Sequence, residues 1–216
     1  MRKFVSLLLV FAVFFTFAAC GETTLTEEES LATAKELAQK ADCFWGLLLG
    51  EWSTEASENA PRHDFLRSDT WVDTYVLYED AYIRTMSMEY GIGPHSLADY
   101  DMGHWNSVQD IQNDLKSVVN DWETWWNKGS DRFLEVGGRL FCLENQEASV
   151  SFIAGWEFSD DKEDKFKEMR VVSRAPEKIV LEMPFSENPD QESVWHQFSL
   201  IRKENGTWVL NGWLQN

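Results

Sequence analysis

The side chains best suited to hold a metal ion lie between positions 95 and 104. Two histidines and two aspartates occur there within ten residues: His95, Asp99, Asp101 and His104. Imidazole and carboxylate groups are common ligands of zinc and calcium. Their spacing matches no established metal loop, and the surrounding chain is rich in glycine. We therefore expect a polar surface loop with no metal or other cofactor, and metal binding is the alternative.

Catalytic motifs are missing from the sequence. It has no G-x-x-x-x-G-K phosphate loop, no G-x-G-x-x-G dinucleotide turn, no H-E-x-x-H zinc motif and no G-x-S-x-G nucleophile elbow. A cysteine–histidine hydrolase would need Cys43 or Cys142 as its nucleophile. Both cysteines have bulky apolar neighbours, which do not favour the reactive thiolate. We expect no catalytic residues and no enzymatic activity.

Tryptophan is unusually frequent, with 11 residues in 216. Exposed aromatic side chains anchor protein partners or stack on sugar rings, whereas buried ones fill the gap between a helix and a curved sheet. Core packing is the favoured interpretation, and a binding surface is the alternative. The candidate residues for such a surface are Trp105, Trp122, Trp125 and Trp126. Core positions are also expected for Trp156, Trp195, Trp208 and Trp213, which alternate with polar residues.

The first 20 residues have the pattern of a secretory signal. Arg2 and Lys3 precede an apolar run, which ends in small residues before Cys20. The sequence Phe17-Ala18-Ala19-Cys20 resembles the bacterial lipobox, although Phe17 replaces the usual leucine. The resemblance implies removal of residues 1–19, lipidation of Cys20 and a short tether over residues 20–25. It places the domain at the outer face of the bacterial plasma membrane, attached through the lipid.

Charge limits the range of partners. The chain has 37 acidic and 19 basic side chains, a net charge of -18, and loss of Arg2 and Lys3 with the signal would make it -20. Such a charge excludes bulk electrostatic attraction to nucleic acid or to an anionic membrane. The remaining cysteines, Cys43 and Cys142, fit either a disulfide of an exported protein or two buried thiols.

Helical periodicity appears twice. Thr26 and Glu29 form a capping-box pattern, after which apolar residues recur every three or four positions up to Leu48. A second helix is expected to start at Ser107 and to run to about Asn127. The segments 51–69 and 91–105 are interpreted as irregular loops.

Strand patterns make up most of the remainder. Residues 71–77 and 81–88 are expected to form a hairpin, and the Gly137-Gly138 pair predicts another. Further strands are predicted at 148–158, 166–174, 178–185, 193–203 and 207–213, with 160–164 as a loop. The sequence therefore predicts one α+β domain over residues 26–216. One or two helices would pack on a curved antiparallel sheet of about five to seven strands.

Two motifs carry a resemblance to known families. The segment 25–30 entering an alanine-rich helix, and the segments 114–119 and 131–141, are similar to the IseA family of secreted inhibitors of peptidoglycan DL-endopeptidases. They also resemble NTF2-like lipoproteins, which have a cone-shaped α+β domain with an aromatic-lined pocket. The resemblance covers the first helix and about residues 107–142. The candidate inhibitory loops are 51–69 and 91–104.

Two functions of different classes follow. The first is a non-catalytic binding or inhibitor module of the cell envelope, for which the resemblance implies a cell-wall hydrolase as partner. The second is a domain that binds a small ligand or a cell-wall glycan in an aromatic pocket, with an enzymatic variant that uses one carboxylate. A deep aromatic pocket with an inward carboxylate would favour the second function. A filled core with a protruding segment would favour the first.

Overall fold

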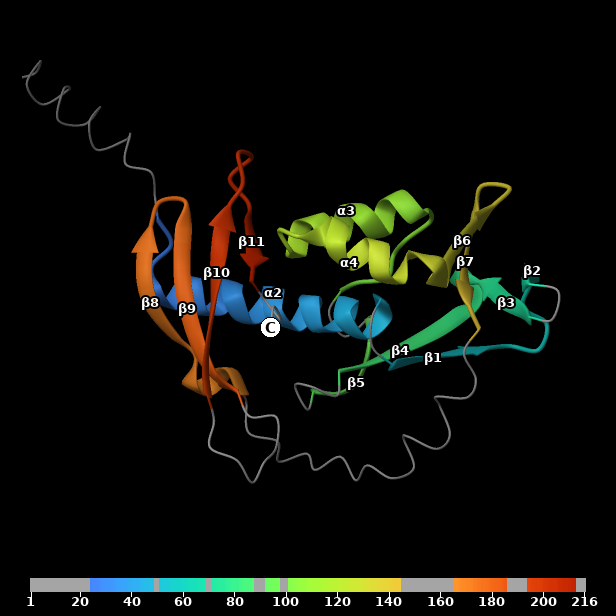
Figure 1. The fold of residues 1–216 in the computed structure, drawn as a ribbon, viewed down its shortest axis with the longest axis horizontal. Coiled ribbons are helices and arrows are strands. Elements are labelled where there is room, and N and C mark those ends of the chain that lie inside the picture. Colours follow the sequence, from blue (N-terminus) through green and yellow to red (C-terminus); the bar gives the residue numbers. More distant parts are fainter. Residues whose placement is uncertain are drawn as a thin grey trace, which may run out of the picture.

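The protein is described here from a computed structural model that covers residues 24–48, 51–68, 71–87, 92–97, 101–144, 165–185 and 194–212. A long helix, α2 (Glu27–Leu48), runs through the middle of the molecule (Figure 1). One group of strands lies at each end of this helix, and two shorter helices lie along its side. The shorter helices are α3 (Val108–Val118) and α4 (Trp122–Gly129).

The described strands form three antiparallel sheets. The order of the first sheet is β1 (Glu51–Ala56), β4 (Ala81–Ser87) and β5 (Ile92–Ser96). The order of the second is β2 (Arg62–Ser68), β3 (Trp71–Leu77), β7 (Arg139–Leu143) and β6 (Phe133–Val136). The order of the third is β11 (Trp208–Asn211), β10 (Val194–Arg202), β9 (Lys178–Phe185) and β8 (Arg170–Ala175). Short 3-10 turns are η1 (Tyr78–Asp80), η3 (Ser130–Arg132) and η5 (Lys165–Glu168). The predicted α+β class is therefore confirmed, with the strands divided among three sheets rather than gathered in one.

The first helix starts as its sequence predicts. Glu29 accepts a hydrogen bond from the Thr26 amide (2.7 Å), and the Glu29 amide donates to the Thr26 hydroxyl (3.2 Å). This reciprocal pair satisfies backbone donors that the first turn would otherwise leave open. Most side chains of the last two turns are buried, because strands and both other helices contact α2 from several sides. Helix α2 is therefore the common support of both ends of the molecule.

Three sequence predictions are wrong at the level of the elements. The segment 51–69 contains β1 and β2 instead of an irregular loop, and β5 lies within the segment 91–105. Residues 71–77 and 81–87 are strands, but they do not pair with each other. β3 pairs with β2 and β7, whereas β4 pairs with β1 and β5. The short turn η1 separates them, so the chain passes from one sheet to the next at this point.

The second predicted helix begins at its Ser107 cap but is interrupted at Val119. Val119 is extended and bridges Leu210 of β11, and the Asn120 amide donates to the Leu210 carbonyl (2.7 Å). The Asn120 side chain donates to Asn211 (2.9 Å) and accepts from Lys203 (2.5 Å). These contacts with the third sheet replace the helical hydrogen bonds, and the chain resumes as α4.

The later hairpins follow the prediction. Gly137 and Gly138 connect β6 to β7, and both have positive φ angles (59° and 74°), which glycine adopts without steric cost. Gly206 (φ 85°) lies in the turn between β10 and β11. The predicted strand 148–158 and the loop 160–164 lie outside the described residues, as do residues 1–23.

The C-terminal end of α2 lies close to the backbone of α4 at Gly129. A Cβ atom at Gly129 of α4 would lie 2.0 Å from the Leu48 carbonyl oxygen, so only glycine fits there. Arg132 follows in η3 and donates to the carbonyls of Leu47 (2.8 Å) and Gly46 (3.3 Å). A cation here satisfies open carbonyl groups and complements the negative end of the helix dipole.

We predict that Gly129→Ala lowers the free energy of unfolding by about 3 kcal/mol, because backbone faces the added methyl group and cannot move aside as a flexible side chain would. Gly129 has an ordinary φ of -130°, so the effect is purely steric. The matched control is Gly138→Ala, whose Cβ would meet nothing within 4 Å. It should cost only the strain of a positive φ, about 1–2 kcal/mol. Urea denaturation of both variants measures the difference, and equal losses would contradict this packing.

Candidate functional site

The tryptophans proposed from the sequence as a binding surface belong largely to the core. Trp105 is 5% exposed and Trp125 is 3% exposed. Trp122 and Trp126 are half-buried and pack against the same core cluster. The binding-surface alternative is therefore wrong for Trp105 and Trp125, because both rings are buried against aromatic residues of α2.

Ring contacts explain how these residues fill the core. Trp105 stacks on Phe44 of α2 with ring centroids 5.8 Å apart, and its indole nitrogen donates to Asp114 (2.6 Å). Trp125 meets Trp45 edge to face at 5.5 Å. Because both the rings and the indole N–H of Trp105 have partners, this cluster has the properties of a packed core.

Tyr78 completes the same cluster. Its ring lies 5.7 Å from that of Trp105, and its hydroxyl donates to the Gly103 carbonyl (2.9 Å). Burial raises the pKa of the Tyr78 hydroxyl far above its ordinary value, so the group stays protonated and acts as a donor.

The two cysteines do not form a disulfide. Cys43 on α2 and Cys142 on β7 are both buried thiols, so the buried-thiol alternative is the one observed. The Cys142 thiol lies 3.8 Å from the Val76 carbonyl oxygen. Burial raises the pKa of Cys142 to about 12, so this thiol is not an available nucleophile at neutral pH.

The segment with metal-ligating residue types does not form a metal site in the part that is described. Asp101 and His104 are strongly exposed, with 3.6 Å between the Asp101 carboxylate and the His104 ring nitrogen. Asp99 and the His95 side chain lie outside the described residues. Within the described ranges no three histidine, cysteine or acidic side chains come together.

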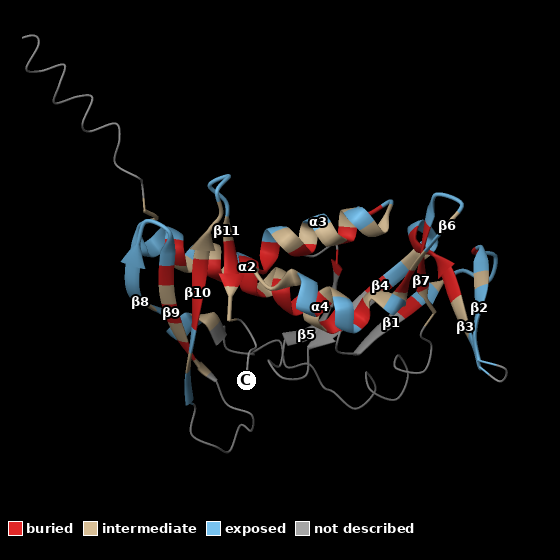
Figure 2. Cartoon of the chain, turned by 45° about the horizontal axis from the view of Figure 1, so that its top comes forward, coloured by how far each residue is buried: buried red, intermediate tan, exposed pale blue. Residues whose placement is uncertain are grey.

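Large apolar side chains are instead exposed on β2 and β3. Leu66 and Trp71 are each 63% exposed, and Phe65 and Val72 are exposed beside them. We call these four residues, Phe65, Leu66, Trp71 and Val72, the hairpin tip. The two strands lie at one end of the molecule, where β2 is largely exposed and β3 is exposed over its first residues (Figure 2). Exposed apolar side chains that gather in one place commonly mark interaction sites.

The register shows that the hairpin tip is apolar on both faces. Leu66 pairs directly with Val72, so their side chains lie on the same face. Phe65 pairs with Asp73 on the opposite face, where the Trp71 indole nitrogen donates to Asp73 (2.6 Å). A partner could therefore contact the projecting strands from either side.

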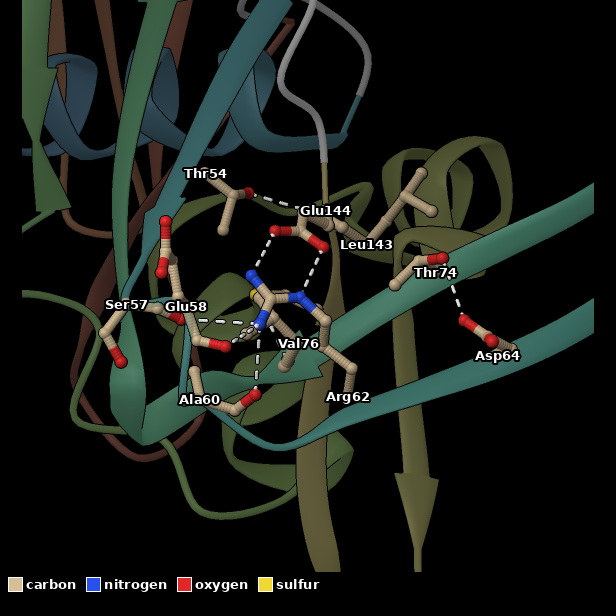
Figure 3. A network of polar contacts seen from close by, with 11 residues as sticks. Thr54, Ser57, Glu58, Ala60, Arg62, Asp64, Thr74, Val76, Leu143 and Glu144 are labelled. Carbon is tan, nitrogen blue, oxygen red and sulfur yellow. Dashed lines mark hydrogen bonds and ion pairs between the residues drawn. The ribbon is translucent and has the colours of Figure 1, made fainter.

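Ion pairs attach the hairpin to the rest of the molecule, one near its base and one beside its tip. Arg62 donates to both carboxylate oxygens of Glu144 (2.7 and 2.9 Å) and to the carbonyls of residues 57, 58 and 60, as Figure 3 shows. The hydrogen bond to Glu144 raises the pKa of Arg62. On the other face, Arg67 is paired with Asp73 and with Asp131 (2.9 Å). These contacts hold the tip in place relative to β7 and η3.

A second exposed group of apolar residues lies on the third sheet. Trp195 of β10 is exposed, which contradicts its predicted core position, and the Arg170 guanidinium lies 4.1 Å from its ring centroid. Arg170 also pairs with Glu182 (2.5 Å). Val172 of β8 and Val194 of β10 are also exposed. Trp208 is half-buried against the core, as predicted, whereas Trp156 and Trp213 lie outside the described residues.

Sequence reasoning missed the hairpin tip because the segment 51–69 was interpreted as a loop. Its signal was present: the apolar pairs Phe65-Leu66 and Trp71-Val72 flank a short polar stretch, which is a hairpin pattern. A scan against protein-family models and a search of curated proteins gave no match to this chain. None of the described helices is both long and apolar enough to span a membrane.

We predict that Cys43 and Cys142 do not react with a thiol reagent at pH 8 in the native protein, because both are buried. Both should react once urea unfolds the chain. A Cys20→Ser variant removes the N-terminal thiol from the count, and mass spectrometry of the labelled peptides identifies the modified positions. Rapid labelling of Cys142 without denaturant would show that β7 is not packed as described.

Proposed function

We propose that this chain is a non-catalytic binding module of the bacterial cell envelope and that the hairpin tip is its contact surface. The observation that supports this proposal is the exposure of Leu66 and Trp71 on strands that ion pairs attach to the rest of the molecule. Binding energy at protein interfaces concentrates in a few large side chains, and tryptophan is prominent among them. A preformed surface also loses little conformational entropy on binding.

A cell-wall hydrolase is the partner that we propose. The similarity of the segments 25–30, 114–119 and 131–141 to inhibitors of DL-endopeptidases supports this partner. Phe65 and Leu66 lie within the segment 51–69, one of the two candidate inhibitory segments. The net charge of -18 would speed association with a basic cleft.

The position of the N-terminal end of α2 is consistent with a membrane anchor at Cys20. Leu25 lies beside β8, where Arg174 donates to its carbonyl (3.2 Å), and the hairpin tip lies at the opposite end of the molecule (Figure 1). The 22 residues of α2 alone span about 33 Å. A lipid on Cys20, four residues before Thr24 and so at most about 14 Å from it along the chain, would leave the tip free to point away from the membrane.

The aromatic-pocket function has weaker support. It needs aromatic side chains that line an open cavity with an inward carboxylate. The Trp105 and Tyr78 rings pack on each other instead, and the Asp114 carboxylate accepts the hydrogen bond of the Trp105 indole. We therefore propose the binding module without a glycan or small-ligand pocket in this cluster.

We predict that the purified protein at micromolar excess inhibits a cell-wall DL-endopeptidase and that Val72→Asp weakens this inhibition about tenfold or more, because it places a charge in the contact surface. The matched control is Val172→Asp. Val72 is 54% exposed and Val172 is 48% exposed, and both lie on strands, but Val172 lies in the third sheet.

Release of peptidoglycan fragments measures the inhibition, and thermal unfolding verifies that both variants fold. Unchanged hydrolysis at micromolar excess of the unmodified protein would reject the hydrolase as partner. Equal loss of inhibition by both valine variants would reject the hairpin tip as the contact surface.

A further inference from the structure

We propose that β2 binds an extended segment of a cationic partner protein as an additional strand of its sheet. This inference deepens the proposed function and rests on it, since it specifies how the partner meets the hairpin. β2 is an outer strand in the sheet order β2-β3-β7-β6, and within the described residues only β3 pairs with it. An unpaired strand edge offers a row of backbone donors and acceptors to another chain.

The register identifies which backbone groups are open. The Leu77 amide donates to the Pro61 carbonyl (2.9 Å), so residues 61 and 77 are a hydrogen-bonded pair. Hydrogen-bonded and non-hydrogen-bonded pairs alternate along antiparallel strands. His63 and Phe65 therefore direct their backbone N–H and C=O groups toward β3, whereas Asp64 and Leu66 direct theirs to the outer edge.

Side chains beside this edge favour a strand with apolar residues. A residue added opposite Leu66 would extend the cross-strand row that Leu66 and Val72 already form. Its neighbours in sequence would lie on the face of Phe65. Both faces of the added strand would thus meet exposed apolar groups of the hairpin tip.

The negative net charge of the chain favours a cationic partner over a second copy of this chain. Arg62 and Arg67 on β2 are already paired with Glu144, Asp73 and Asp131. Two copies would each bring a net charge of -18 to the interface, and these charges repel. A two-fold pairing centred on Asp64 would also place the two Asp64 carboxylates opposite each other, which destabilises a sheet.

The test uses a short synthetic peptide of alternating lysine and valine, added to the purified full chain in a nonionic detergent. We expect saturable binding and slower hydrogen exchange at the Leu66 amide, whereas the Phe65 amide, already directed to β3, should change little. The same peptide with every lysine replaced by glutamate should bind about tenfold more weakly or not at all, because of charge repulsion.

A pair of variants at one position isolates the backbone contribution. Asp64→Pro removes the outward N–H and adds a ring at the edge, whereas Asp64→Ala keeps the N–H and loses only the carboxylate. Proline is tolerated on edge strands where the N–H faces solvent. We expect Asp64→Pro to weaken peptide binding about tenfold relative to Asp64→Ala, because a hydrogen bond and the space for the strand are both lost.

Strand addition would be overturned by absence of peptide binding, by equal peptide affinity of the two Asp64 variants, or by Leu66 protection that appears without peptide and rises with protein concentration. The last result would identify a second copy as the occupant. If Asp64→Pro does not fold, hydrogen exchange of the unmodified chain with and without peptide tests the inference. Peptide binding that does not slow exchange at the Leu66 amide more than at the Phe65 amide would reject strand addition. If Val72→Asp loses inhibition but binds the peptide as tightly as the unmodified chain, this inference alone is rejected. If the peptide adds as a strand but Val72→Asp has no effect on hydrolysis, the hydrolase function alone is rejected.

Discussion

The contact between Gly129 and the carbonyl of Leu48 determines how α4 and the sheet that carries the hairpin tip are placed on α2. Here the backbone of α4 touches the backbone of the last turn of α2, and Arg132 caps the same turn. From η3 the chain enters β6, which pairs with β7, and β7 pairs with β3. The end of α2 therefore fixes the position of the hairpin tip through the paired strands β6, β7 and β3. The third sheet is fixed separately, by Asn120 and by the contact of Arg174 with Leu25.

This arrangement separates the aromatic residues into two populations. Trp105 and Trp125 pack on Phe44 and Trp45 of α2 and stabilise the centre of the molecule. Trp71 is the first residue of β3 and remains exposed. Burial of large rings stabilises a fold through the apolar area that they remove from water, and the same area becomes binding energy when it is left on the surface. The proposed binding function rests on this difference.

Local signals in the sequence predicted local structure well. The cap of Thr26 and Glu29, the cap at Ser107 and the Gly137-Gly138 turn all form as predicted, because each depends on neighbouring residues alone. Pairing between distant strands could not be derived in the same way. Residues 71–77 and 81–87 are adjacent in sequence but join different sheets, and Val119 leaves the helix because β11 offers it a partner. Burial also depends on tertiary contacts, so the sequence did not reveal that the tryptophans near α4 are largely buried and that the hairpin tip is exposed.

Hydroxyl-radical footprinting of the tryptophans, read by mass spectrometry, tests the central claim most directly. It reports in one experiment which indole rings are in contact with water, and the 11 tryptophans provide their own internal reference. The account predicts rapid oxidation of Trp71 and slow oxidation of Trp105 and Trp125 in the free protein, with protection of Trp71 when an endopeptidase is added. Oxidation of Trp105 and Trp125 as fast as that of Trp71 would contradict it.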